Sequence, residues 1–150
     1  MSSEDKNLLQ QIGRTGRAMH AAFESEVGMA LPRWRILQVL HERGGAAQKD
    51  LARWLSMDPA FLTRQMKQME SEGIVKRRIS PDDNRVTLVE LAQTGKAIFE
   101  AAQPLRFAFS LSALEGFSGD SLDAAMAVLE ALEERFRAAG SASRDRSSSG

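Results

Sequence analysis

Hydrophobic residues recur at helical spacing along most of the chain, so the pattern predicts a mainly α-helical protein. Helices are predicted over 5–28, 31–43, 48–56, 58–73, 93–115 and 121–139. Two β-rich runs, 74–79 and 86–91, lie between the fourth and fifth helices and flank a turn of Pro, Asp and Asn residues. That arrangement indicates a hairpin. The predicted fold class is therefore mainly α with one small β-hairpin.

Two stretches depart from a regular helical pattern. Pro104 lies inside the 93–115 segment and is expected to kink or break that helix. Residues 141–150 are rich in Ser and Arg and contain no large apolar side chain, so we expect a disordered tail there.

The helix predicted over 58–73 has clear signals at both ends. Asp58 is suited to cap the free amides of the first turn, and Gly73 supplies a left-handed residue that ends a helix. Its apolar stripe consists of Leu62, Met66 and Met69. The residues off this stripe are Pro59, Ala60, Thr63, Arg64 and Lys67. Such a face suits a helix that enters a DNA major groove, although taken alone it fits an amphipathic helix with a solvated basic face equally well.

The hairpin that follows favours the DNA-binding interpretation. Its first strand and its turn carry four cations, namely Lys76, Arg77, Arg78 and Arg85. A hairpin that projects an arginine beside a recognition helix is typical of the winged variant of the helix-turn-helix. In that arrangement the arginine enters a narrow minor groove while the helix reads the major groove.

The segment from Gly73 to Arg85, continuing to Gly95, closely resembles the wing of MarR-type transcriptional regulators. Asp83 and Arg85 occupy the aspartate and the second arginine of that family's D-x-R motif, and Arg77 occupies the arginine that follows the recognition helix. Leu91 and Gly95 match the leucine and glycine where the wing returns to a long helix. The run 49–52 resembles the opening of the helix that precedes the recognition helix. The similarity covers roughly residues 8–139.

Three positions depart from the family pattern. Asn84 stands where an arginine is common, which removes one cation from the wing. Ala47 and Ala92 stand where the family often has a helix-capping threonine. Loss of a cap costs about 1 kcal/mol, so these two helix starts are expected to be softer or to begin elsewhere.

The resemblance implies a winged helix-turn-helix whose N- and C-terminal helices interlock into a two-fold dimer. Within one structural domain we expect a dimerisation helix over 1–30, the DNA-binding region over 31–91, a long helix and a C-terminal dimerisation helix over 92–140, and the tail. The expected dimer contacts are Leu8, Ile12, Leu122, Met126, Leu129 and Phe136. A single-chain core that absorbs these apolar helices is the alternative.

The resemblance also implies the roles of the wing residues. The expected DNA contacts of the wing are Arg77, Arg78, Asp83 and Arg85. Asp83 is expected to act indirectly by steadying the wing through a basic partner, for which Arg77 is the candidate.

Composition narrows the class of protein. A chain of 150 residues with 43% hydrophobic residues is long enough to bury a substantial core. There is no cysteine, which excludes disulfides, thiolate metal sites and thiol-based redox sensing. We find neither a run of apolar residues long enough to cross a membrane nor a signal-peptide pattern, so we expect a soluble, cytoplasmic protein without membrane contact.

The net charge of zero hides an uneven distribution. Residues 33–85 contain eleven Lys and Arg against seven Asp and Glu, a surplus of four positive charges, and the rest of the chain carries the opposite surplus. Binding to DNA depends on the local field over the docking face, so this asymmetry agrees with a DNA-binding central region.

The sequence offers no constellation for catalysis. His20 and His41 are the only histidines, on different predicted helices and without cysteine, which is too few ligands for a metal centre. Ser118 and Ser121 are better explained as the capped start of a helix than as nucleophiles. We therefore expect no enzyme activity and no cofactor.

A small-molecule site is suggested mainly by the resemblance, because family members often bind aromatic acids or phenols beside the dimer helices. The residues that could line such a site are Arg17, His20, Trp34 and Phe99. An arginine beside aromatic rings suits an aryl carboxylate. The alternative is that Trp34 belongs to the core and that Arg17 is a solvated surface cation.

Together these features predict a homodimeric winged helix-turn-helix regulator that binds double-stranded DNA at a pseudo-palindromic operator. We expect a repressor that is relieved by a small aromatic acid or phenolic effector. The alternative is a winged-helix interaction module that uses its basic wing to bind acidic partners without sequence-specific DNA recognition.

Overall fold

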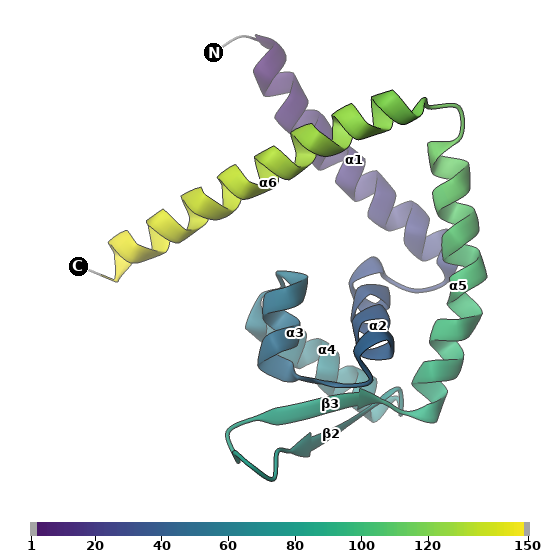
Figure 1. The fold of residues 1–150 in the computed structure, drawn as a ribbon, viewed down its shortest axis with the longest axis vertical. Coiled ribbons are helices and arrows are strands. Elements are labelled where there is room, and N and C mark those ends of the chain that lie inside the picture. Colours follow the sequence, from purple (N-terminus) through teal and green to yellow (C-terminus); the bar gives the residue numbers. More distant parts are fainter. Residues whose placement is uncertain (1–2, 149–150) are drawn as a thin grey trace. The chain divides into compact units, whose positions relative to one another are not determined.

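The computed structural model describes the backbone of residues 3–148 and the side chains of residues 7–148 (Figure 1). The elements are α1 (Ser3–Val27), α2 (Leu31–Arg43), β1 (Ala46–Ala47), α3 (Gln48–Leu55), α4 (Pro59–Ser71), β2 (Val75–Ile79), β3 (Thr87–Leu91), α5 (Gln93–Leu114) and α6 (Gly119–Ser147). The prediction of a mainly α fold with a small β-wing is confirmed. Every predicted helix is present, with ends that shift by a few residues except at the C-terminus of α6.

The three strands form an antiparallel sheet in the order β1-β3-β2. Strands β2 and β3 make the predicted hairpin, with Val75 opposite Leu91 and Ile79 opposite Thr87. The two-residue strand β1, with Ala46 opposite Val89, was not predicted. A pair of alanines carries no strand signal, and only the presence of β3 beside it makes this segment extended.

Local signals explain where the helices of the winged region begin and end. The Asp58 carboxylate accepts a hydrogen bond from the amide of Phe61, 3.0 Å away, and so caps α4 as predicted. Gly44 ends α2 in the left-handed conformation, at φ 72°. Ala47 makes no side-chain cap, in agreement with the absence of a threonine there, and α3 still begins at Gln48 because Ala47 is already extended within β1.

The core lies where the end of α1, α2, α3, α4, the sheet and the first half of α5 meet. Its most completely buried large side chains include Ile36, Leu37, Leu51, Leu62, Met66, Met69 and Phe99. The predicted stripe of α4 is therefore the face that packs inward. At the edge of this core an ion pair of 2.7 Å joins Arg33 of α2 to Glu72 at the end of α4, and the hydrogen bond from Arg33 lowers the pKa of Glu72.

Gly95 allows α5 to start directly against the wing. A Cβ atom at this position would lie 2.2 Å from the carbonyl oxygen of Ile74, which is far inside van der Waals contact. The same carbonyl accepts a hydrogen bond of 2.9 Å from the amide of Ala92. The start of α5 is thus held by the backbone of the residue that precedes β2, and the absence of a side chain at Gly95 is what permits the approach.

Two expectations about the helical pattern change. Pro104 does not break α5, which runs from Gln93 to Leu114, and a kink there stays a prediction. Pro104 and Glu100 are both exposed, so water can reach the carbonyl that the proline leaves without a donor. α6 continues to Ser147, so residues 141–147 are helical rather than disordered. The hydroxyl of Ser147 donates to the carbonyl of Arg144, and Arg144 and Arg146 in the last turn suit the negative end of the helix dipole. Residues 149–150 of the predicted tail lie outside the described residues.

The chain divides into two compact units, residues 1–111 and 112–150, and the boundary falls inside α5. The first unit contains the winged region together with α1, α2 and most of α5. The second contains the end of α5 and α6, and no residue of α6 is buried. Over the described residues, none of the helices combines the length and the apolarity needed to cross a bilayer.

Candidate DNA-binding surface

The outward face of α4 carries the side chains that the sequence assigned to base reading. Pro59, Ala60, Arg64 and Lys67 are exposed, and Thr63 is half-buried. The opposite face of the helix is held by Leu62, Met66 and Met69, each at most 1% exposed. Because the inward face is packed into the core, the core fixes which side chains of α4 face outward.

Thr63 is tied to two neighbours. Its hydroxyl donates to the carbonyl oxygen of Pro59, at 2.9 Å, and accepts from Nε2 of Gln48, at 3.1 Å. Gln48 is the first residue of α3, so this contact links the two helices of the helix-turn-helix.

The same glutamine reaches the wing. Its Oε1 accepts from Nη1 of Arg77 in β2, at 3.4 Å, and Nη2 of Arg77 pairs with Glu70 of α4, at 3.2 Å. The Arg77 side chain is only 21% exposed, and its Nε is buried without a hydrogen-bond partner among the described residues. Arg77 therefore lies between α3, α4 and β2, and most of its donors point into the protein rather than toward a partner.

Asp83 does not pair with Arg77, which corrects the expected partner. Its carboxylate accepts from Nε of Arg85 at 3.1 Å, from Nη2 of Arg85 at 3.3 Å and from the backbone amide of Arg85 at 3.0 Å. The partner is Arg85 because the hairpin turn brings residues two apart face to face, whereas Arg77 is held by Glu70 and Gln48. The side-chain hydrogen bond from Arg85 and then the backbone hydrogen bond lower the pKa of Asp83, with a smaller contribution from the charge of Lys49.

Pairing with Asp83 leaves the Arg85 side chain exposed to solvent. Its side chain is 87% exposed although two of its nitrogens are bound to Asp83. An exposed guanidinium that is already held in one orientation loses less side-chain entropy when it docks than a free one would.

The helix and the wing border a common hollow of about 310 Å³. It is lined by Gln48, Lys49, Ala52, Pro59, Leu62, Thr63, Arg85, Val86 and Thr87. The surface thus combines the N-terminal half of α4, the adjoining face of α3 and the turn end of the wing.

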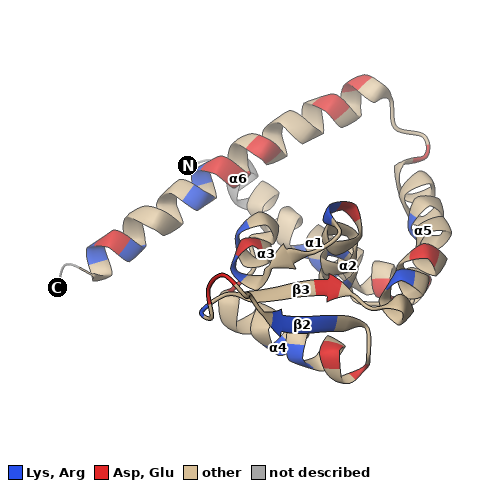
Figure 2. Cartoon of the chain, turned by 60° about the horizontal axis from the view of Figure 1, so that its bottom comes forward, with Lys and Arg blue, Asp and Glu red and all other residues tan. Residues whose placement is uncertain are grey.

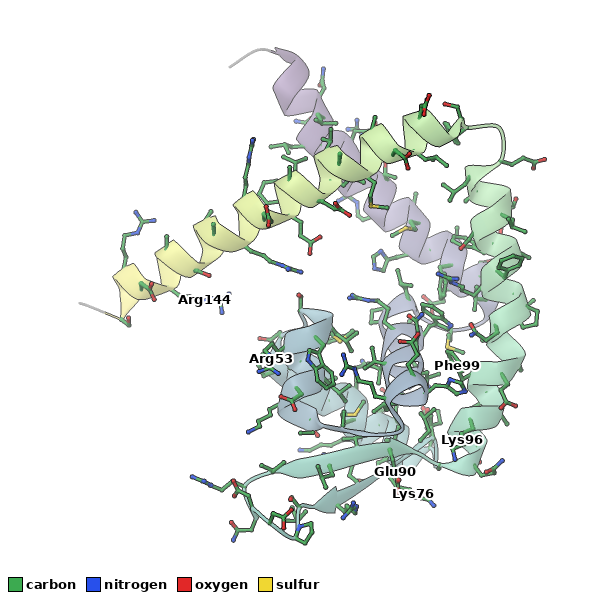
Figure 3. The ribbon with its side chains drawn as sticks, viewed as in Figure 1. Arg53, Lys76, Glu90, Lys96, Phe99 and Arg144 are labelled. Carbon is green, nitrogen blue, oxygen red and sulfur yellow. The ribbon has the colours of Figure 1, made fainter. Side chains whose placement is uncertain are left out.

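Cations extend this surface along the wing (Figure 2). Figure 2 shows the run of Lys and Arg on β2 and further cations on α4, with an acidic position on β3. Lys76 lies opposite Glu90 in the strand register, and Figure 3 places both on the hairpin near the start of α5. Lys76 and Arg78 are exposed, so β2 offers two solvent-facing cations beside the more enclosed Arg77.

The candidate effector residues are only partly brought together. Trp34 and Phe99 are buried and stacked, with ring centroids 6.4 Å apart, and Figure 3 shows Phe99 between α5 and α2. Arg17 and His20 are exposed on α1, and Nδ1 of His20 lies 2.7 Å from the Gly16 carbonyl oxygen of its own helix.

Two other residues, Arg106 and His41, lie beside the aromatic rings where Arg17 and His20 were expected. The Arg106 guanidinium lies 5.0 Å from the Trp34 ring centroid, and the His41 ring lies 4.5 Å from that of Phe99. Nε1 of Trp34 is buried without a hydrogen-bond partner among the described residues. Periodicity could have found Arg106, because it lies seven residues after Phe99, two turns along the same helix.

The expected dimer residues lie on unburied apolar surface. Met126, Leu129 and Phe136 of α6 are each about half exposed, Leu122 is half-buried, and on α1 Leu8 is exposed while Ile12 is half-buried. The structure adds apolar residues that the sequence analysis did not single out, namely Phe107, Leu111, Leu114 and Phe117, between 52% and 63% exposed.

The region described by the structure contains no group of three or more His, Cys, Asp or Glu that could hold a metal ion. The surface of α3, α4 and the wing is built from cations and small side chains.

Comparisons with known proteins agree with this geometry. The sequence model of the MarR family matches residues 29–87. The uncharacterized HTH-type transcriptional regulator YdgJ of Bacillus subtilis is 32% identical over 118 residues, covering 79% of this chain and 72% of YdgJ. The HTH-type transcriptional repressor Rv2887 of Mycobacterium tuberculosis is 28% identical over 96 residues, covering 64% of this chain and 69% of the repressor.

A solved structure shows the same fold. A mutant of MarR from E. coli, complexed with operator DNA, superimposes with a TM-score of 0.79 at 21% identity, covering 86% of this chain and 95% of that one. These relatives are transcriptional regulators, which form a non-enzymatic family. The chain belongs to the MarR family of winged helix-turn-helix, DNA-binding transcriptional regulators.

Proposed function

We propose that this regulator places α4 in the major groove of a specific operator while the tip of the wing enters the adjacent minor groove. The observation that carries the proposal is the common border of α4, α3 and the wing, where Thr63 and Arg85 line one hollow and Arg64 and Lys67 are exposed on α4. A recognition helix and a wing arranged in this way engage neighbouring grooves.

The exposed cations are assigned to two kinds of contact, some to bases and some to phosphates. Arg64 presents five donors that match the two acceptors of a guanine edge, whereas Lys67 is one turn nearer the C-terminus and suits a phosphate. Arg85 suits a narrow minor groove, and Arg78 suits the phosphate backbone beside it. Arg77 is assigned a supporting role instead of a DNA contact, because Glu70 and Gln48 hold its guanidinium.

We further propose that the operator is a pseudo-palindrome bound by a homodimer. The apolar residues of α6, of α1 and of the end of α5 are exposed in the single chain, and a second copy would cover them. A two-fold dimer places two recognition helices about one helical turn apart, roughly 10–10.5 bp between half-site centres. Repression is the proposed mode of action, in keeping with the description of Rv2887 as a repressor.

The proposed effector is a small aromatic acid or phenol that binds beside the aromatic cluster of the first unit. Arg106 over Trp34, the unsatisfied Trp34 Nε1 and the pair of Phe99 with His41 offer a cation, a donor and ring faces close together. A ligand that favours a dimer geometry unsuited to the operator needs about 1.4 kcal/mol of differential affinity for tenfold derepression. Arg17 and His20 remain candidates at the exposed α1 surface.

The effector is tested by adding salicylate-like and nicotinate-like acids to the protein. Thermal shift then measures ligand binding, and gel shift measures the change in operator binding. Arg106→Ala should remove the ligand effect while leaving operator affinity nearly intact, and Arg17→Ala is the matched comparison on α1. The buried Trp34 is better probed as Trp34→Phe than as alanine, because truncating it opens the core. If no acid at millimolar concentration changes the melting temperature or the operator binding, the regulator does not respond to this class of effector.

The test of the DNA-binding function is selection of bound fragments from random duplex DNA, followed by affinity measurements on the selected site. Arg64→Ala should weaken that site by about 1–3 kcal/mol, whereas Lys67→Ala should weaken all sequences alike. A steep linear fall of log K with log salt marks phosphate contacts. Enrichment of no sequence, together with binding to acidic proteins, would favour the alternative of a winged-helix module for acidic partners.

A further inference from the structure

The hydroxyl of Thr63 has no proton left for DNA. A hydroxyl carries a single donor, and that donor is directed at the carbonyl oxygen of Pro59, 2.9 Å away. One of its two acceptor positions is filled by Nε2 of Gln48, at 3.1 Å. Guanine N7 and O6, adenine N7, thymine O4 and the phosphate oxygens are all acceptors, so a hydrogen bond from Thr63 to any of them would cost its hydrogen bond to Pro59.

The Gln48 contact is itself fixed in direction. An arginine can only donate hydrogen bonds, so the amide oxygen of Gln48 must face Nη1 of Arg77, and its NH₂ group must face Thr63. Arg77 is in turn anchored by Glu70. The chain of contacts from Glu70 to Thr63 therefore holds the threonine side chain in a single arrangement.

What Thr63 can still offer a base is its methyl group and one acceptor position, which only the amino group of adenine or cytosine could use. Its neighbours on the same exposed face are Pro59 and Ala60, whose side chains are wholly apolar. The N-terminal half of the recognition helix thus presents three small apolar groups in a row, and the polar groups begin with Arg64. In the major groove the one apolar group on a base edge is the C5 methyl of thymine.

We propose that Thr63, flanked by Pro59 and Ala60, recognises thymine by methyl–methyl contact and not by a hydrogen bond. This inference rests on the proposed entry of α4 into the major groove and adds the class of base that this part of the helix selects. Each operator half-site then contains at least one thymine whose C5 methyl contributes to affinity at the position beneath Thr63.

Replacing thymines of the selected half-site one at a time by deoxyuridine isolates the contact, because deoxyuridine lacks the methyl and keeps every hydrogen-bonding group. One replacement should weaken the wild-type protein about fourfold, the value of one buried methyl. Thr63→Ser keeps the hydroxyl and removes the methyl, so it should bind the thymine and deoxyuridine operators equally. Thr63→Val keeps the methyl and removes the hydroxyl, so it should still discriminate between them.

The opposite results would overturn the inference. Wild-type affinity that is insensitive to deoxyuridine at every thymine excludes a methyl contact without the use of any variant. Discrimination that survives in Thr63→Ser, or is lost in a folded Thr63→Val, assigns the contact to the hydroxyl or to another residue. These results are separate from the wider proposal, because an operator that Arg64→Ala weakens shows α4 in the groove even if deoxyuridine has no effect.

Discussion

At the scale of single residues, the wing tip is organised by the pair of Asp83 and Arg85. Three hydrogen bonds from Arg85 stabilise the ionised carboxylate and hold the pKa of Asp83 below its ordinary value. A carboxyl with a lowered folded pKa stabilises the wing above its unfolded pKa, and that contribution is lost as the pH falls through the lowered value. The wing tip is therefore expected to stay ordered until the solution is more acidic than the ordinary Asp range.

This relation is measurable by NMR titration of the side-chain carboxyl of Asp83. In Arg85→Ala the pKa of Asp83 should rise toward its ordinary value, because the side-chain hydrogen bonds, including the largest cause of the shift, are removed. Arg78→Ala is the control, since Arg78 is not among the causes of that shift, and it should leave the pKa nearly unchanged. An Asp83 pKa that is the same in wild type and Arg85→Ala would contradict the pairing.

Arg77 and Lys67 are both basic residues of the proposed surface, yet they should respond differently to mutation. Arg77→Gln breaks contacts to Glu70 and Gln48, so it should lower operator affinity and wing stability while leaving the salt slope unchanged. Lys67→Gln removes an exposed cation, so it should reduce the salt slope by about 1 and leave the melting temperature unchanged. Affinities at several salt concentrations, together with melting curves, separate the two cases. If Arg77→Gln reduced the salt dependence of operator affinity, Arg77 would be a phosphate contact rather than a supporting residue.

At the scale of elements, the junction between the wing and α5 depends on Gly95. Gly95→Ala places a carbon 2.2 Å from the Ile74 carbonyl oxygen, so the backbone of α5 or of β2 must shift. The expected loss is about 1–3 kcal/mol in the free energy of unfolding, in line with other overpacked sites.

A matched control for this variant is Gly16→Ala, in α1, where an added Cβ meets nothing within 4 Å. Alanine is a better helix former than glycine, so this change should stabilise the protein by about 0.5–1 kcal/mol. Denaturant unfolding of both variants is the measurement. If Gly95→Ala were as stable as wild type, the junction would accommodate a Cβ atom and the expected clash with the Ile74 carbonyl would be wrong.

At the scale of the whole molecule, the exposed apolar residues of α6 predict self-association. Leu129→Gln together with Phe136→Gln should convert a dimer into a monomer and, with it, abolish tight binding to a palindrome while preserving binding to a half-site. Truncation after Gly140 removes no large apolar residue, so it is expected to leave the dimer intact even though it removes helical residues. Sedimentation velocity measures both variants, and a wild-type monomer at micromolar concentration would overturn the prediction.

The features that depend on neighbours along the chain could be predicted from the amino-acid pattern. Periodicity located the helices, the Pro/Asp/Asn turn located the wing, and Asp58 and Gly73 predicted helix ends that the structure retains. The D-x-R spacing brings Asp83 and Arg85 together within one turn. Local signals suffice in these cases because helix formation, capping and tight turns are governed by interactions between residues a few positions apart.

The pairing of side chains that are distant along the chain could not be predicted in this way, because it depends on how the elements pack. Arg77 was expected to support Asp83, but folding places it against Glu70 and against Gln48, which is 29 positions away. The strand β1, the position of Arg106 over Trp34 and the occupied hydroxyl of Thr63 depend in the same way on how elements pack. A pattern along one chain shows which face of an element is buried, but the partner of each polar group on that face is chosen by geometry in three dimensions, where a buried donor or acceptor must find whichever group the packing brings within reach.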